Sequence, residues 1–212
     1  MLKVEVNKDF FTCTHYSCWV RMTARDKLWE AEFFLNKLHA PFKNAKPGHL
    51  VLLIKNAEKG WNAYLSAFLS AMRSILDHLL EDYNIKHSLD IPLTEKLYPR
   101  TFKRRAKELK DEAALNFLKW WKMKMREINK DPTCSFLFNL RHISTHRRQV
   151  RPGIAKVTLF ASKEGEKSKP ARGAIVHGWF FRDHDEEDIL TMCNKYFAAM
   201  KEIVDEANRK YL

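Results

Sequence analysis

The chain has 212 residues, which is enough for one well-buried core or at most two small ones. Hydrophobic residues make up 45% and charged residues 30%, with 6 Gly and 7 Pro, so the composition excludes disorder as the default and favours helix. The net charge is +12, and residues 100–182 carry the surplus, with 21 basic and 7 acidic residues. This concentration indicates a polyanionic partner, with nucleic acid ahead of an anionic membrane surface, although basic proteins often carry such charge without one.

The N-terminal segment predicts no clear element beyond residues 2–6, where apolar and polar side chains alternate as in a short strand. We treat residues 1–25 as an N-terminal extension of the domain. A first helix is expected from Asp26, because large apolar side chains recur near every 3.6 positions until Pro41 ends the pattern. Packing in the core is the expected role of that helix.

The second predicted helix is long and strongly apolar. It follows a break at residues 46–48 and runs to about Tyr83, and its wide apolar stripe is typical of a helix in the middle of a bundle. Arg73 and Asp77 lie four positions apart beside this stripe, so they share a face and can pair. Such pairs are usually solvated, but their place beside the stripe makes both residues candidates to support a site.

A third helix is expected from about Thr101, as its cap, to Lys130, just before Asp131 and Pro132. Its polar face is strongly basic and carries Lys103, Arg104, Arg105, Lys107, Lys110, Lys119, Lys122, Lys124 and Arg126. Two interpretations stay open, a solvated charged face and a surface for nucleic acid. Under the second interpretation, the predicted nucleic-acid contacts on this helix are Lys103, Arg104 and Arg105.

The C-terminal third predicts a fourth helix, two strands and a last helix. The fourth helix begins near Pro132, where proline suits a first turn. Two β-rich runs, residues 154–161 and 174–181, enclose a polar loop and predict a β-hairpin. Asp183 or Asp185 is the expected cap of the last helix, whose acidic first turn suits the helix dipole.

Together these elements predict a single, mostly α domain over residues 1–212. We expect a bundle of four to five helices, with a β-hairpin at residues 154–182 inserted before the last helix. No internal repeat or linker divides the sequence. The uncharged stretch in the most apolar segment, Trp61–Met72, has 12 residues and includes polar ones, so it is too short to span a bilayer.

The cysteines show no paired spacing of a secreted disulfide framework; they are Cys13, Cys18, Cys134 and Cys193. The chain also starts without a charged and then apolar signal segment, so we expect a reduced protein in the cytoplasm. Cys13, His15 and Cys18 provide half of a zinc site at most, because no second Cys or His pair stands at a matching distance. We therefore expect no metal and no cofactor.

The densest chemistry lies at residues 137–148, LFNLRHISTHRR, on the fourth predicted helix. Arg141, His142 and His146 fall within six positions of one another. Imidazoles titrate near neutral pH and guanidinium groups hold phosphate, so this stretch can move protons and bind phosphate esters. The arginines that follow are further predicted nucleic-acid contacts: Arg147, Arg148 and Arg151.

Arg141 and His146 do not share a face of an ideal helix, where they lie about 140° apart. We place Leu140 at the centre of the buried face, which puts the histidines near the back. Three arrangements still join Arg141 and His146: the arginine side chain wraps round, the helix loosens near His146, or two copies meet across a two-fold axis. Metal-free RNA cleavage needs a base, an acid and positive charge on the phosphate, which two copies supply. Ser144 and Thr145 add hydroxyl groups.

The motif R-H-I-S-T-H at residues 141–146 is similar to the HEPN signature, in which a polar residue follows an arginine and a histidine comes four to six residues after that arginine. The stretch SAFLSAMRS in the second predicted helix also resembles HEPN-like proteins of bacteria and archaea. The resemblance covers about residues 26–148 and the last helix. It leaves out the N-terminal extension and the hairpin.

The resemblance implies an all-α homodimer whose motif helices face each other. In active members it implies a metal-independent endoribonuclease, often a toxin or a component of phage defence. Arg141 would then hold the scissile phosphate, His146 would act as acid or base, and His142 would orient the site. The implied partners are RNA, a second copy of the chain, and an antitoxin or another protein. The alternative is a catalytically inactive HEPN-like module that binds nucleotide or RNA, or contacts protein.

Overall fold

The structure is a computed structural model that describes residues 21–43, 55–92, 97–146, 154–161, 172–181, 184 and 186–212. For residues 41–43, 55–59, 141–146, 154–161 and 172–179 it describes the backbone alone. Several predicted features lie outside the described residues: most of the N-terminal extension with Cys13, His15 and Cys18, the break at residues 46–48, the arginines Arg147, Arg148 and Arg151, and the caps Asp183 and Asp185.

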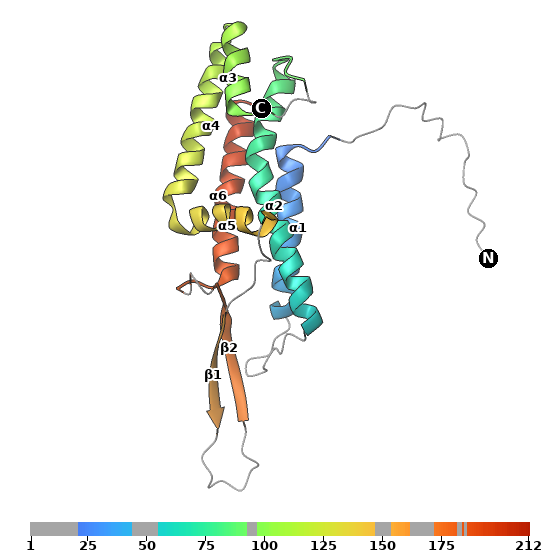
Figure 1. Cartoon of the computed structure of the whole chain (residues 1–212), viewed down its shortest axis with the longest axis vertical. Coiled ribbons are helices and arrows are strands. Elements are labelled where there is room, and N and C mark those ends of the chain that lie inside the picture. Colours follow the sequence, from blue (N-terminus) through green and yellow to red (C-terminus); the bar gives the residue numbers. More distant parts are fainter. Residues whose placement is uncertain are drawn as a thin grey trace, which may run out of the picture.

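The described chain is mostly helical, as predicted. Its elements are α1 (Ala24–Lys43), α2 (Lys55–Lys86), α3 (Pro99–Glu108), α4 (Glu112–Lys130), α5 (Pro132–His146), β1 (Ile154–Ala161), β2 (Arg172–Phe180) and α6 (Ile189–Lys210). Helices α1, α2, α4 and α6 run along the long axis of the molecule, α5 crosses them, and α3 lies beside the upper part of α4 (Figure 1). Within the described residues, no helix offers the long apolar stretch that a membrane crossing requires.

Helix α2 lies at the centre of the bundle, and its apolar stripe is confirmed. Residues of this stripe with no exposed surface are Leu65, Phe68, Met72, Ile75 and Leu79. Two buried indoles donate hydrogen bonds to backbone carbonyls around α2, Trp61 to Leu38 at 3.1 Å and Trp121 to Leu76 at 2.8 Å. These bonds satisfy the polar edges of large side chains in the core, which would otherwise be costly to bury.

The third predicted helix is two helices, so the expected count of four to five is too low for the described chain. Lys110 has a left-handed backbone with φ of 54°. The amide of Asp111 donates to the carbonyl of Ala106 at 2.9 Å, a pattern that ends α3. The Asp111 side chain then accepts from the amide of Ala114 at 2.9 Å and caps α4. Glycine is usual at the left-handed position, and its absence hid this turn in the sequence.

The start of α3 also differs from the prediction. Pro99 is the first residue of the helix and Tyr98 precedes it as the cap, without a side-chain hydrogen bond. Thr101 lies inside the helix. Proline at the first helical position already has the required φ and gives up an amide that has no partner there, so the helix begins without a capping hydroxyl.

Strands β1 and β2 form a two-stranded antiparallel sheet that extends from the lower end of the bundle (Figure 1). At its base, Ile154 lies opposite Phe180. Phe181 follows β2 and is buried, and its ring centre lies 5.2 Å from that of Phe136 on α5. Aromatic packing therefore joins the base of the sheet to α5.

The last helix begins at Ile189, and its cap is Asp188. The Asp188 side chain accepts hydrogen bonds from the amides of Leu190 and Thr191 at 3.1 and 3.2 Å. The sequence placed this residue inside the first turn, with the cap earlier. Several acidic residues precede the helix, and burial of Ile189 and Met192 fixes which of them stands at its start.

Candidate functional site

Helix α5 carries the HEPN-like motif over its last two turns. It begins at Pro132 after Asp131, whose carboxylate accepts from the amide of Cys134 at 2.9 Å and caps the helix. The same carboxylate forms a 3.0 Å ion pair with Lys195 of α6. The hydrogen bond from the backbone amide of Cys134, together with Lys195, holds the pKa of Asp131 below its usual value. A charged cap therefore fixes the start of α5 against α6.

The buried side of α5 is not centred on Leu140, as the sequence suggested. Cys134, Leu137 and Phe138 are buried, with exposed fractions of 2%, 0% and 7%, whereas Leu140 is half-buried and Asn139 is exposed. The helix crosses the bundle and contacts α2, α4 and α6, so its buried side depends on three neighbours. Periodicity alone does not reveal such a crossing.

This shift of the buried stripe changes where the motif positions lie. Position Arg141 comes three residues after Phe138 and therefore lies on the same face of the helix as Phe138. Positions His142 and His146 come three and seven residues after Asn139, so they share its exposed side. The backbone stays helical through His146, which removes a loosened helix as the means of joining it to Arg141. The two positions remain about 140° apart.

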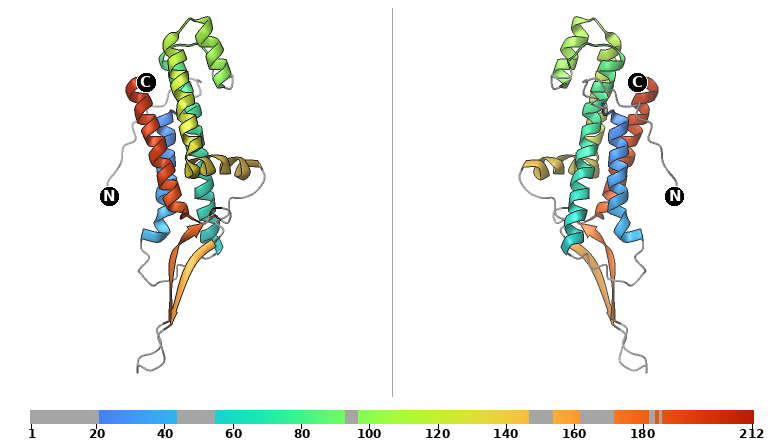
Figure 2. Two further views of the ribbon diagram at one scale, coloured as in Figure 1. Left: turned by 90° about the vertical axis from the view of Figure 1, so that its left-hand side faces the viewer. Right: turned by 90° about the vertical axis from the view of Figure 1, so that its right-hand side faces the viewer.

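The C-terminal end of α5 projects from the bundle, on the same side as α3 (Figure 2). The motif positions therefore lie on a helix end that stands away from the four long helices. Ser144 and Thr145 occupy this end too, on the side of position 141.

Arg73 contacts the motif helix directly. Its guanidinium carbon lies 3.7 Å from the centre of the Phe138 ring, one turn before Arg141. Such a contact contributes on the order of 1 kcal/mol. Asp77 is exposed on the next turn of α2. Arg73 is therefore placed to position α5 from α2, which the predicted pairing with Asp77 did not foresee.

The three basic residues predicted on α3 do not act alike. Lys103 and Arg104 are exposed. Arg105 is half-buried, and its Nε donates to the carbonyl of Leu89 at 2.8 Å while its other nitrogens lie 3.3 Å from Glu108 and 3.8 Å from Asp90. Arg105 therefore joins α3 to the segment after α2. Its role as a nucleic-acid contact stays a prediction.

Sequence reasoning missed a groove between α3 and α4. Two lysines from each helix line it, and two leucines complete the lining: Lys103, Lys107, Leu115, Leu118, Lys119 and Lys122. All four lysines stood in the predicted basic run, but the break at Lys110 brings the two halves of that run side by side. Recognising the turn at Lys110 in the sequence would have predicted the groove.

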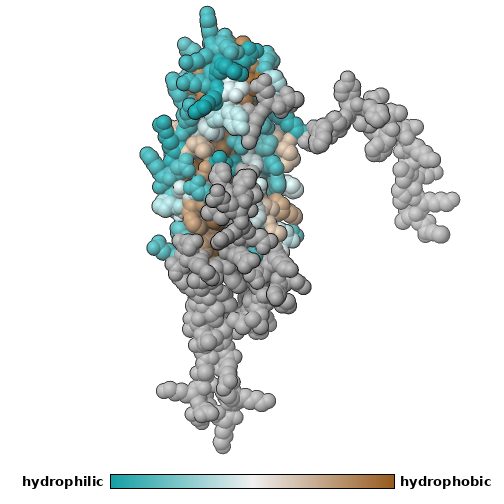
Figure 3. Space-filling model, viewed as in Figure 1, coloured by the Kyte–Doolittle hydropathy of each residue, from teal (hydrophilic) through white to brown (hydrophobic). Residues whose placement is uncertain are grey.

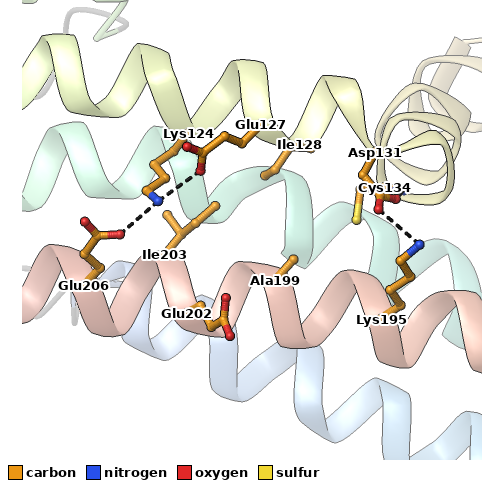
Figure 4. A pocket seen from close by; sticks show the side chains of 10 residues that line it. All are labelled: Lys124, Glu127, Ile128, Asp131, Cys134, Lys195, Ala199, Glu202, Ile203 and Glu206. Atoms are coloured by element: carbon orange, nitrogen blue, oxygen red, sulfur yellow. Dashed lines mark hydrogen bonds and ion pairs between the residues drawn. The ribbon is translucent and has the colours of Figure 1, made fainter.

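A second pocket, of about 200 Å³, lies between α4 and α6 beside the start of α5 (Figure 4). Lys124 crosses it and pairs with Glu127 and Glu206, at 2.9 Å each. Figure 4 also shows Lys195 reaching Asp131 at the other end. Apart from the exposed Glu202, the charged groups that line this pocket pair with one another, so we assign the pocket a structural role. Lys124 is accordingly unlike the exposed lysines predicted beside it.

The two described cysteines are poor nucleophiles. Burial and the nearby Asp131 raise the pKa of Cys134 to about 12. Burial also raises the pKa of Cys193. Both thiols are therefore protonated at neutral pH. Among the described residues, no group of three His, Cys, Asp or Glu side chains gathers as a metal site.

Comparison with protein families, with curated proteins and with solved structures finds no match to this chain. The resemblance to HEPN proteins therefore rests on the motif at residues 141–146 and on its place in the bundle.

Proposed function

We propose that the chain is a HEPN-like, metal-independent endoribonuclease whose active site forms where two copies of α5 meet. The observation that carries this proposal is the position of the motif, on the projecting end of a regular helix, with positions 142 and 146 on the same side of the helix as Asn139. One helix holds Arg141 and His146 about 140° apart, so two copies supply what one does not.

The proposed reaction is transfer of the phosphate to the neighbouring 2′-hydroxyl. His146 of one copy takes the proton from the 2′-hydroxyl, whose oxygen then bonds to phosphorus. The bond from phosphorus to the 5′-oxygen breaks, and His146 of the second copy gives a proton to that oxygen. Arg141 balances the negative charge that grows on the phosphate oxygens. The products carry a 2′,3′-cyclic phosphate and a 5′-hydroxyl.

The remaining motif residues have supporting roles in this proposal. His142 lies on the same side of α5 as His146 and orients the site, and Ser144 and Thr145 add hydroxyl groups. Arg73 positions α5 through Phe138, and Asp77 lies near it on α2. We further propose action in the cytoplasm as a toxin or phage-defence component, with an antitoxin or another protein as regulator.

A second candidate is a catalytically inactive module of the same kind that binds nucleotide or RNA, or contacts protein. One observation favours it: position 141 lies on the same face of α5 as the buried Phe138, a face on which an arginine often serves a polar interface. In this candidate Arg141 and His146 hold a ligand or a second copy without chemistry.

A cleavage assay separates the two candidates. Single-stranded RNA is incubated in EDTA with the wild type, Arg141→Ala, His146→Ala and the control His39→Ala, which alters a histidine on α1 that contacts Asn194. We expect each motif variant to lose about 100-fold or more in rate and the control to keep wild-type activity. RNA with a 2′-deoxyribose at the cleavage point should resist. Absent cleavage by the wild type, or equal cleavage by all variants, contradicts the enzyme proposal.

A further inference from the structure

The groove between α3 and α4 gathers four ammonium groups around an apolar floor. It encloses about 300 Å³ and is lined by Lys103 and Lys107 from α3, Lys119 and Lys122 from α4, and two leucines. The four lysines are exposed, and the surface over α3 and the upper part of α4 is strongly hydrophilic (Figure 3).

The positive charge of this lysine groove is not balanced by carboxylates of the described chain. None of its four lysines forms an ion pair with a described residue. Two of the nearby acidic residues pair elsewhere, Glu108 with Arg104 and Arg105, and Glu127 with Lys124. A third, Glu112 in the first turn of α4, is exposed and forms no ion pair with a lysine of the groove. Lys119 contacts the side-chain oxygen of Asn116, at 3.4 Å. Uncompensated like charges in one groove favour an anionic ligand.

The charge continues along α4 toward the motif helix. Four basic residues of α4 are exposed and lie within about 60° of a single direction around the helix axis: Lys119, Lys122, Arg126 and Lys130. Between residues 119 and 130 the single acidic residue is Glu127, about 80° from Lys119 and paired with Lys124. A basic line therefore runs from the lysine groove to the junction of α4 and α5.

The lysine groove and the motif lie on one side of the molecule. Figure 2 shows α3 and the end of α5 projecting in the same direction. From Lys122 to Pro132 the rise along α4 is about 15 Å, and from Pro132 to Arg141 along α5 it is about 14 Å. The helices cross, so the separation is on the order of 20 Å. A stacked strand at 3.4 Å per nucleotide needs about six nucleotides to span it.

We propose that the lysine groove and the basic line of α4 bind the sugar-phosphate backbone of single-stranded RNA and lead it to the motif on α5. This substrate-binding role rests on the proposed ribonuclease function. A strand fits better than a membrane, because the charges follow one narrow line and the groove has a leucine floor that can receive a base. Substrates shorter than about six nucleotides would engage only one end.

Binding to an uncleavable strand tests this role apart from catalysis. Fluorescence anisotropy is measured with 2′-O-methyl RNA of about 16 nucleotides, for the wild type and for Lys119→Gln/Lys122→Gln. The matched control, Lys86→Gln/Lys201→Gln, removes two exposed charges outside the groove. We expect the groove variant to bind about tenfold more weakly near 0.1 M salt and its log–log salt slope to fall by about 1.4. The control should stay within about twofold.

Equal losses in the groove variant and the control overturn the proposal, because net charge would then explain both. The proposal also fails if the groove variant keeps its RNA affinity but loses binding to phosphatidylserine vesicles. If the wild type fails to cleave RNA but the groove variant binds RNA more weakly, the ribonuclease proposal is wrong and the RNA-binding role of the groove is supported. If the wild type cleaves RNA and the groove variant binds RNA as tightly as the wild type, only the RNA-binding role of the groove is rejected.

Discussion

Glu206 accepts hydrogen bonds from three side chains on two helices. Lys210 approaches it at 2.6 Å, Lys124 at 2.9 Å and the indole of Trp120 at 3.0 Å. These donors lower the pKa of Glu206 to about 2. The charged carboxylate is therefore better stabilised in the folded protein than in the unfolded chain, and it ties α4 to α6 at the end of the pocket that lies away from the start of the motif helix.

We expect Glu206→Gln to lower the free energy of unfolding by about 1 to 2 kcal/mol at neutral pH. Because the folded pKa is depressed, the wild-type advantage is fully present above the ordinary value of 4.5 and is lost as pH falls toward about 2. Urea unfolding of the wild type and of Glu206→Gln across this pH range measures the difference in their free energies of unfolding. A difference between the two proteins that stays constant down to pH 2 contradicts this role of Glu206.

Residue types were easier to predict than residue partners. The sequence alone picked out Arg141 and His146, because histidine and arginine at close spacing suggest phosphate chemistry wherever they fold. It did not show that Arg105 turns inward to Leu89 or that Lys124 sits between Glu127 and Glu206. Both depend on segments that are distant in sequence, so a helical wheel could not separate them from exposed basic neighbours.

The turn between α3 and α4 depends on a single backbone conformation, because Lys110 adopts φ of 54° there. Glycine reaches this region without the steric cost that a side chain brings. We therefore expect Lys110→Gly to be more stable to unfolding than Lys110→Ala by about 0.5 to 1 kcal/mol. In one continuous helix glycine would be the less stable by about 1 kcal/mol. In chemical denaturation, Lys110→Gly should therefore be the more stable variant if α3 and α4 are two helices, and Lys110→Ala should be the more stable variant if they form one helix.

The elements could be predicted as far as their patterns are local. The apolar stripe of α2, the proline start of α5 and the acidic approach to α6 each follow from neighbouring residues. The buried side of α5 could not be predicted, because it depends on α2, α4 and α6 together. That difference matters for the site, since it puts position 141 on the face of Phe138 and positions 142 and 146 on the side of Asn139.

On the scale of the whole molecule, two features point to the same side. The end of α5 and the α3–α4 pair both project there, and the basic line of α4 connects them (Figure 2). The sequence predicted a helical bundle and a basic C-terminal half, but it did not place the charge relative to the motif. That relation arises because α5 crosses the bundle. A composite site therefore requires two chains to meet at this projecting end.

Mixing wild-type chains with His146→Ala chains tests the composite site most directly. If both copies contribute His146, exchange into mixed dimers removes activity, and a ninefold excess of His146→Ala should lower RNA cleavage per wild-type chain about tenfold. A matched excess of His39→Ala, which keeps the motif intact, should cause no such loss. If cleavage per wild-type chain does not change with added His146→Ala, each chain acts alone and the two-copy site is wrong.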